Sequence, residues 1–199
     1  MMEYFHQGGP LMWPILLCSI LALGIFLERL WSFFRLNRGS RELVKEVEEL
    51  VVKQRLDEAV IVCQRYGTPL AHILLAALRA KGRSRDQIKT AVEEAGSRES
   101  APLERYLGLL GTIATISPLL GLLGTVLGMI EAFTVIATQG MGTPATLGGG
   151  ISEALITTAA GLSVAIPVIL LHKYLTSRLD RIVLEMEASS LRLVDLLGG

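Results

Sequence analysis

The sequence predicts an all-α membrane protein with three transmembrane helices that are extended by cytoplasmic helices. The first observation is the distribution of cations. The first 28 residues contain no Lys or Arg, 15 of the 19 basic residues lie between Arg29 and Arg105, and the other four lie from Lys173 onward. Because Lys and Arg are retained on the cytoplasmic side of a membrane, this distribution predicts three crossings with the N-terminus outside.

The second observation is the length of three apolar runs. Residues 11–27, 106–130 and 154–171 are uncharged for 17, 25 and 18 residues. At about 1.5 Å per residue, a helix of each run approaches or exceeds the roughly 30 Å of bilayer hydrocarbon. Buried helices of a soluble protein are the alternative for any single run, but three runs that agree with the cation distribution favour spans. The cations follow the first run, which favours a retained span over a cleaved signal peptide.

The cytoplasmic parts show helical periodicity. Apolar residues recur at three- and four-residue spacing between 39 and 105, and Thr68 before Pro69 is typical of an N-cap followed by proline at the first helical position. We expect the second span to begin as a cytoplasmic helix, with Pro102 as a kink or boundary. An apolar stripe after residue 174 predicts an amphipathic helix that packs on another helix.

Together these patterns divide the chain into seven segments. They are a short periplasmic N-terminus (1–10), the first transmembrane helix (11–31), a cytoplasmic helical region (32–105), the second transmembrane helix (106–133), a periplasmic loop (134–143), the third transmembrane helix (144–174) and a cytoplasmic amphipathic helix (175–199). This topology places the C-terminus in the cytoplasm.

The sequence does not favour an enzyme. The glycines near Gly121 and Gly148 lack the ending of a phosphate-binding loop, the three histidines lack metal-ligand spacing, and no nucleophile, base and orienting group can be assembled. Cys18 lies in the first span and Cys63 in the cytoplasmic region, so neither a disulfide nor a metal site is indicated. We therefore predict no cofactor and no metal.

Small residues gather on one face of the second span. Gly121, Thr125 and Gly128 follow one another at i, i+4 and i+7, and Gly124 widens this patch. Close helix packing explains such a face, because glycine lets backbones approach and threonine can bond a carbonyl one turn back. A polar role for the Thr125 hydroxyl remains the alternative.

The third span carries an ionisable residue. Glu153, Thr157 and Gly161 share one face, and Thr158 lies about 100° around the helix. If the helix starts at Ser152, Glu153 is only a first-turn acid that favours the helix dipole. If it starts with Thr143 as N-cap and Pro144 at the first position, Glu153 lies about two and a half turns inside. A buried carboxyl there would face the interior of a bundle and belong to a proton or ion path.

The second and third spans resemble those of a known family. Residues 117–129 (SPLLGLLGTVLGM) are similar to the second-span signature of the MotA/TolQ/ExbB proton channel family, and residues 150–167 are similar to its third-span signature. The Trp13-Pro14 pair and the closing Glu28-Arg29 of the first span are also similar. Residues 56–71 fit more loosely.

The resemblance implies a ring of identical subunits, a pentamer in this family. It encloses the single spans of ExbD-like or TolR-like partners, each with an essential aspartate, and a TonB-like or TolA-like protein carries the work to the outer membrane. It also implies the longer of the two third helices, together with a set of functional residues. The proton pathway would contain Glu153, Thr125, Thr158 and Thr157, and helix packing at the pore would involve Gly121, Gly124, Gly128, Gly161, Pro118 and Pro167.

By the same resemblance, we expect a multi-pass protein of the bacterial inner membrane that uses the proton motive force for TonB-dependent transport. An ExbB-like subunit is favoured because the chain has three spans and a short cytoplasmic region. A TolQ-like subunit of a Tol-Pal type system and a passive membrane scaffold are the alternatives. Carboxyl and hydroxyl groups could serve H⁺ or Na⁺.

Overall fold

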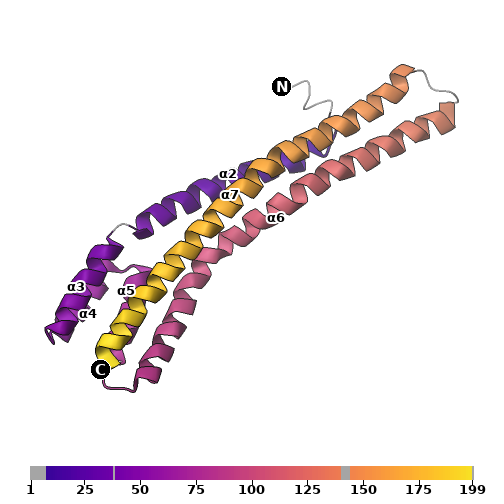
Figure 1. Cartoon of the computed structure of the whole chain (residues 1–199). Coiled ribbons are helices and arrows are strands. Elements are labelled where there is room, and N and C mark those ends of the chain that lie inside the picture. Colours follow the sequence, from indigo (N-terminus) through magenta and orange to yellow (C-terminus); the bar gives the residue numbers. More distant parts are fainter. Residues whose placement is uncertain (1–7, 38, 140–143, 199) are drawn as a thin grey trace. The chain divides into compact units, whose positions relative to one another are not determined.

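The computed structural model describes residues 8–37, 39–139 and 144–198, and within these ranges the chain forms helices and no strands. The helices are α2 (Met12–Asn37), α3 (Ser40–Val52), α4 (Leu56–Tyr66), α5 (Pro69–Arg79), α6 (Arg85–Gln139) and α7 (Pro144–Gly198) (Figure 1). Three helical stretches, containing α2, α6 and α7, are long and apolar enough to cross a membrane. The predicted all-α membrane fold with three spans is thereby confirmed.

The two longest helices each combine an apolar and a charged part. Helix α6 runs from Arg85 to Gln139 and α7 from Pro144 to Gly198, with 55 residues in each. The second span therefore continues a charged helix, as expected, but Pro102 is not a helix boundary because α6 passes through it. A proline lacks one N–H group, and a long helix can tolerate that loss without ending. The segment after residue 174 is the C-terminal part of α7.

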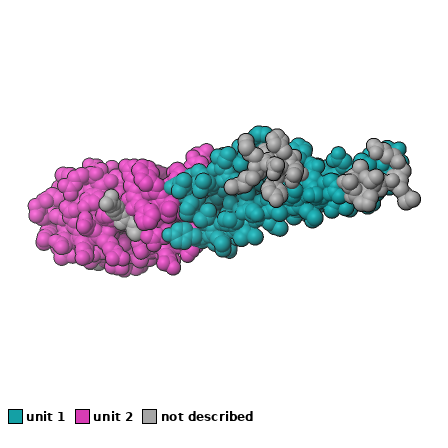
Figure 2. Space-filling model, turned by 90° about the horizontal axis from the view of Figure 1, so that it is seen from above, with its two compact units in different colours: residues 1–27, 107–174 teal, residues 28–106, 175–199 magenta. Residues whose placement is uncertain are grey.

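The chain forms two compact units, and α2, α6 and α7 each contribute to both (Figure 2). Unit 1 comprises residues 1–27 and 107–174, which include the apolar runs. Unit 2 comprises residues 28–106 and 175–199, which include α3, α4 and α5. Eighteen of the chain's basic residues fall in unit 2 by sequence, and only Lys173 falls in unit 1.

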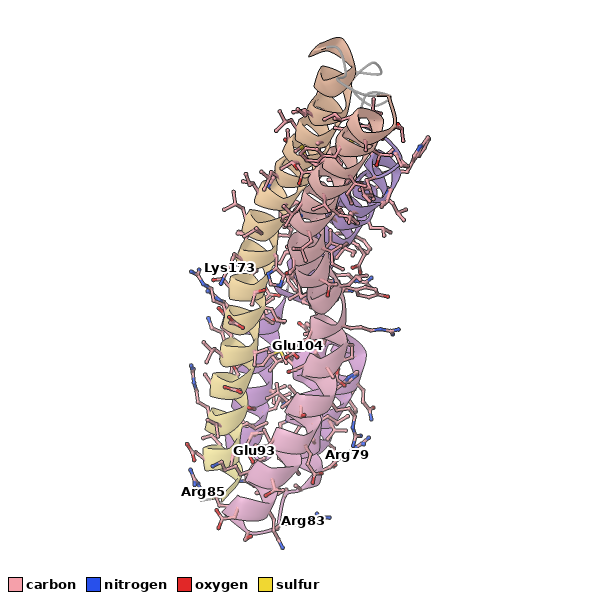
Figure 3. The ribbon with its side chains drawn as sticks, turned by 90° about the vertical axis from the view of Figure 1, so that its right-hand side faces the viewer. Arg79, Arg83, Arg85, Glu93, Glu104 and Lys173 are labelled. Carbon is pink, nitrogen blue, oxygen red and sulfur yellow. The ribbon has the colours of Figure 1, made fainter. Side chains whose placement is uncertain are left out.

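Unit 2 has the amphipathic organisation that the periodicity predicts. The N-cap at Thr68 is confirmed, since its hydroxyl accepts a hydrogen bond from the Ala71 amide at 3.3 Å. Apolar side chains from five helices are buried, among them Leu43, Val47, Cys63, Ile73, Leu74, Ala77, Ile88, Leu175, Leu193 and Val194. Charged side chains lie outside this core, as Figure 3 shows for Arg83 and Arg85 near the start of α6. Burial raises the pKa of the Cys63 thiol to about 11, so the thiol stays protonated at neutral pH.

One cation of unit 2 is an exception, because Arg29 is 6% exposed. Its Nη2 donates to Glu28 Oε1 at 2.8 Å, and its Nη1 lies 3.4 Å from the carbonyl oxygens of Pro102 and Leu103. The guanidinium also lies 4.7 Å from the ring centroid of Tyr106. Carboxylate, carbonyl and aromatic partners together compensate the buried charge. Arg29 thus connects α2 to α6.

Replacing Arg29 with alanine is expected to lower the free energy of unfolding by about 2 to 3 kcal/mol, because hydrogen bonds to a charged group are lost together with the ring contact. Thermal unfolding of the detergent-purified chain measures the change. Arg98→Ala is the matched control, since Arg98 is exposed on α6. Equal melting temperatures for the Arg29 and Arg98 variants would show that the buried guanidinium does not stabilise the fold.

Candidate functional site

Helices α6 and α7 run side by side in unit 1, and their backbones approach closely at glycines (Figure 1). A Cβ atom on Gly161 would lie 2.6 Å from the carbonyl oxygen of Ser117 and 3.0 Å from Cα of Gly121. A Cβ atom on Gly128 would lie 2.7 Å from the carbonyl oxygen of Gly150. Real Cβ atoms do not approach backbone atoms so closely, so only glycine permits this contact.

The threonines of α7 lie at the same contact. Thr157 is 1% exposed, and its methyl group occupies the space that a side chain at Gly124 would need. Thr158 is half-buried, and its hydroxyl donates to the carbonyl oxygen of Gly121 on α6 at 2.8 Å. The sequence places Thr158 beside the face of Thr157, and the structure brings both residues to α6.

Thr125 is oriented differently. Its hydroxyl donates to the carbonyl oxygen of Leu122 on its own helix at 2.6 Å, which is the local bond that threonine commonly makes in membrane helices. The side chain is half-buried. Within one chain, the Thr125 hydroxyl therefore bonds its own helix and not α7.

Glu153 lies well inside α7. The helix begins at Pro144, so the carboxylate lies about two and a half turns from the helix start, as in the longer of the two alternatives. Thr143, the expected N-cap, lies outside the described residues. Glu153 is half-buried, and its backbone carbonyl accepts a hydrogen bond from Thr157 Oγ1 at 2.9 Å. It is therefore not a first-turn acid.

A recess of about 100 Å³ adjoins Glu153 and Thr157. Glycines 124 and 128 of α6 form part of its lining. Its volume is sufficient for a few water molecules beside the carboxylate. A carboxyl group, a hydroxyl and water in contact can take up a proton and pass it on.

Two parts of the recess were not anticipated from the sequence. Glu131 of α6 is a second carboxylate in its lining, and Gly8 and Pro10, which precede α2, close another side. The Gly8 carbonyl accepts a hydrogen bond from Thr157 Oγ1 at 2.7 Å. Glu131 follows Gly128 by three residues on the same helix, so the extended small-residue face could have indicated it. The contact of Gly8 joins residues far apart in sequence and has no periodic signal.

The two prolines contribute less to this site within a single chain. Pro118 is half-buried beside the buried Ser117, and Pro167 is exposed on α7. Both lie inside helices, where a missing N–H group is commonly compensated in membrane proteins.

The electrostatics of unit 1 favour cations near Glu153. Lys173 is its sole Lys or Arg by sequence, and it lies about 30 Å from Glu153 along α7. Two carboxylates line the recess, and residues 106–172, which carry both of them, contain no Lys or Arg. Such an arrangement attracts protons and other cations.

Three helices that are long and apolar enough to span a membrane, one of them with a carboxylate well inside it, define a multi-pass membrane protein. Comparison with known proteins makes this class more specific. The chain belongs to the MotA/TolQ/ExbB proton channel family, whose model matches residues 65–188. The matched region includes Thr125, Glu153 and both threonines of the α7 contact.

Curated relatives agree with this assignment. An ExbB-like biopolymer transport protein of Synechocystis is 37% identical over 180 residues, which cover 89% of this chain and 71% of the relative. Biopolymer transport protein exbB1 of Vibrio cholerae is 30% identical over 92% of this chain and 82% of its own length. The Tol-Pal system protein TolQ of Pseudomonas aeruginosa is 31% identical over 81% of this chain and 68% of its own length. These names describe transport and envelope systems, not enzymatic reactions.

Proposed function

We propose that this chain is the proton-channel subunit of an ExbB-like complex that uses the proton motive force to energise a TonB-like protein for outer-membrane transport. The observation that carries the proposal is the half-buried Glu153 inside a membrane-spanning helix, beside the Thr157 hydroxyl and a recess large enough for water. A carboxylate inside a membrane-spanning helix is costly, and such residues face a bundle interior or a water-filled cavity and mark ion paths.

The energy available to such a complex is substantial. One proton that moves through about 100 mV supplies about 2.3 kcal/mol, so several protons can drive a conformational change. In this proposal Glu153 takes up and releases the proton, the hydroxyls of Thr157, Thr158 and Thr125 orient it and its water, and the glycines keep the helices in contact. The aspartate of a single-span partner receives the proton.

The surface of unit 1 supports assembly with other chains. Large apolar residues of α6 and α7 are exposed, among them Leu119, Leu122, Val126, Ile130, Leu155, Ile166 and Leu170. Lipid or neighbouring helices must cover this surface. We propose a homopentameric ring in the bacterial inner membrane that encloses the spans of two ExbD-like subunits. The proposed N-terminus is periplasmic and the proposed C-terminus is cytoplasmic.

A TolQ-like role in a Tol-Pal type system is the second candidate, favoured by the similarity to TolQ of Pseudomonas aeruginosa. Affinity purification of the full chain from its native membranes discriminates the two roles. Both require a co-purified single-span protein with an aspartate in its span, and the associated envelope protein, TonB-like or TolA-like, identifies the system. Recovery of the chain as a ring without any single-span partner would contradict both.

Valine substitutions at the threonines discriminate a proton channel from a passive scaffold. Thr158→Val removes the hydroxyl that bonds Gly121 and preserves the shape, so membrane levels should change little. We expect proton-driven output per assembled subunit to fall by about tenfold or more, because the hydroxyl orients the proton-carrying group or its water. The same measurement applies to Thr125→Val.

Thr112→Val is the matched control, since the Thr112 hydroxyl is exposed and bonds the Gly108 carbonyl of its own helix at 3.0 Å. It should leave output unchanged. If all three valine variants work like the unmodified chain when corrected for protein level, the threonines only pack helices and the scaffold explanation is supported.

A further inference from the structure

The backbone just before α2 lies on the Glu153 carboxylate. We call residues 8–10 the cap segment. Its Gly8 is buried and accepts the hydrogen bond from Thr157, while Gly8 and Pro10 line the recess beside Glu153. The Met12 amide bonds the Gly9 carbonyl at 3.2 Å, which ties the cap segment to the start of the first span. The cap segment is thus held from both α2 and α7.

Gly9 is fitted to this position in two ways. Its φ angle is +68°, a conformation that residues with a side chain adopt rarely. A Cβ atom there would also lie 1.9 Å from Glu153 Oε1 and 3.0 Å from its Cδ. No residue other than glycine can occupy this position unless the carboxylate or the cap segment moves.

The hydrogen bonding of Thr157 gives the cap segment a route to open. Its single hydroxyl proton is within reach of two acceptors, the Gly8 carbonyl at 2.7 Å and the Glu153 carbonyl at 2.9 Å. If the cap segment lifts, the hydroxyl can bond Glu153 alone and is not left without an acceptor. Opening therefore exposes no unsatisfied buried donor, which would otherwise be costly.

We propose that the cap segment closes the Glu153 recess on its N-terminal side, and that Gly9 is the positioning residue that allows this closure. A proton enters from that side when the cap segment lifts and is retained when it returns. This inference rests on the proposed role of Glu153 in the proton path, which it deepens by assigning the entry side.

Chemical modification of residue 153 in the full chain tests the closure. Spheroplasts are treated from outside with a water-soluble carbodiimide and glycine methyl ester, and mass spectrometry follows the peptide that contains Glu153. We expect Gly9→Ala to accelerate modification about fivefold, comparable to the loss of one hydrogen bond. Thr157→Val should do the same, since it replaces the donor to Gly8 with a methyl group, which cannot keep a 2.7 Å contact with the carbonyl oxygen.

Gly24→Ala is the matched control, because Gly24 lies in the first span with no atom within 4 Å of an added Cβ. Wild-type modification rates in both cap variants would overturn the inference, and so would an equal acceleration in Gly24→Ala. If Gly9→Ala does not accumulate, Thr157→Val decides alone.

The outcome is independent of the proposed function, which is tested by proton-driven output of a variant at Glu153. If modification rates are unchanged in the cap variants while Glu153→Gln loses output, the cap inference is wrong and the proposed channel function stands. If modification is faster in the cap variants while Glu153→Gln keeps full output, the cap segment covers a carboxylate that carries no protons, and the proposed channel function is wrong.

Discussion

Replacement of Glu153 by glutamine is expected to abolish proton-driven work while the chain still accumulates and assembles. Glutamine has nearly the same shape and can keep the polar contacts of the recess, but it cannot take up or release a proton at neutral pH. The backbone bond from Thr157 to residue 153 does not depend on the side chain. We expect coupled output to fall about a hundredfold or more, the scale of an essential proton-transfer group.

The measurement compares proton-motive-force-dependent uptake or envelope function in cells with the amount of assembled protein in their membranes. Glu94→Gln is the matched control, because Glu94 is exposed on α6 in unit 2. It should retain full output. Full output in the Glu153 variant at equal protein level would exclude this carboxylate from energy coupling and leave the proposed channel without its central group.

Gly161→Ala is expected to be the most damaging substitution of a small residue. The added methyl group would lie 2.6 Å from the Ser117 carbonyl oxygen and 3.0 Å from Cα of Gly121, and both are backbone atoms of a helix. Neither can rotate away as a side chain can, so α6 and α7 must separate over their contact. Overpacking alone costs about 1 to 3 kcal/mol, and loss of the Thr158 bond to Gly121 adds to this.

Protein level in membranes and melting temperature in detergent test this expectation. Gly149→Ala is the control on the same helix, since an added Cβ there meets nothing within 4 Å and alanine favours a helix more than glycine does. It should be neutral or slightly stabilising. If Gly161→Ala has the same melting temperature as Gly149→Ala, the two helices do not approach as closely in the membrane as the glycine contact requires.

The spans could be predicted from the sequence because the relevant signals are sums over many residues. The cation distribution and the apolar runs do not depend on any single side chain, and they agree with the three long helices. The N-cap at Thr68 could be predicted because its partner is three residues away. Of the two alternatives at Pro102, a kink or a boundary, the boundary was wrong, since the effect of one missing N–H group depends on the stability of the whole helix.

For the candidate site, the sequence predicts which residues are neighbours within one helix but not which segments they contact. Spacing places Glu153, Thr157 and Thr158 near one another, because helical geometry fixes neighbours within a few residues. It does not reveal which carbonyl of α6 accepts from Thr158, or that Gly8 bonds Thr157. These partners are separated by 37 and 149 residues along the chain. The buried position of Arg29 likewise depends on carbonyls 73 and 74 residues away.

The glycine contact between α6 and α7 restricts how this protein can move. With backbones this close at Gly121, Gly128 and Gly161, rotation of either helix about its own axis would bring bulkier side chains into the neighbouring backbone. In unit 1 the pair is therefore expected to behave mechanically as one stiff body. Rotation or sliding of whole helices during the proposed transport cycle would then occur where α6 and α7 contact helices of other chains, so the helix that rotates or slides would belong to another polypeptide.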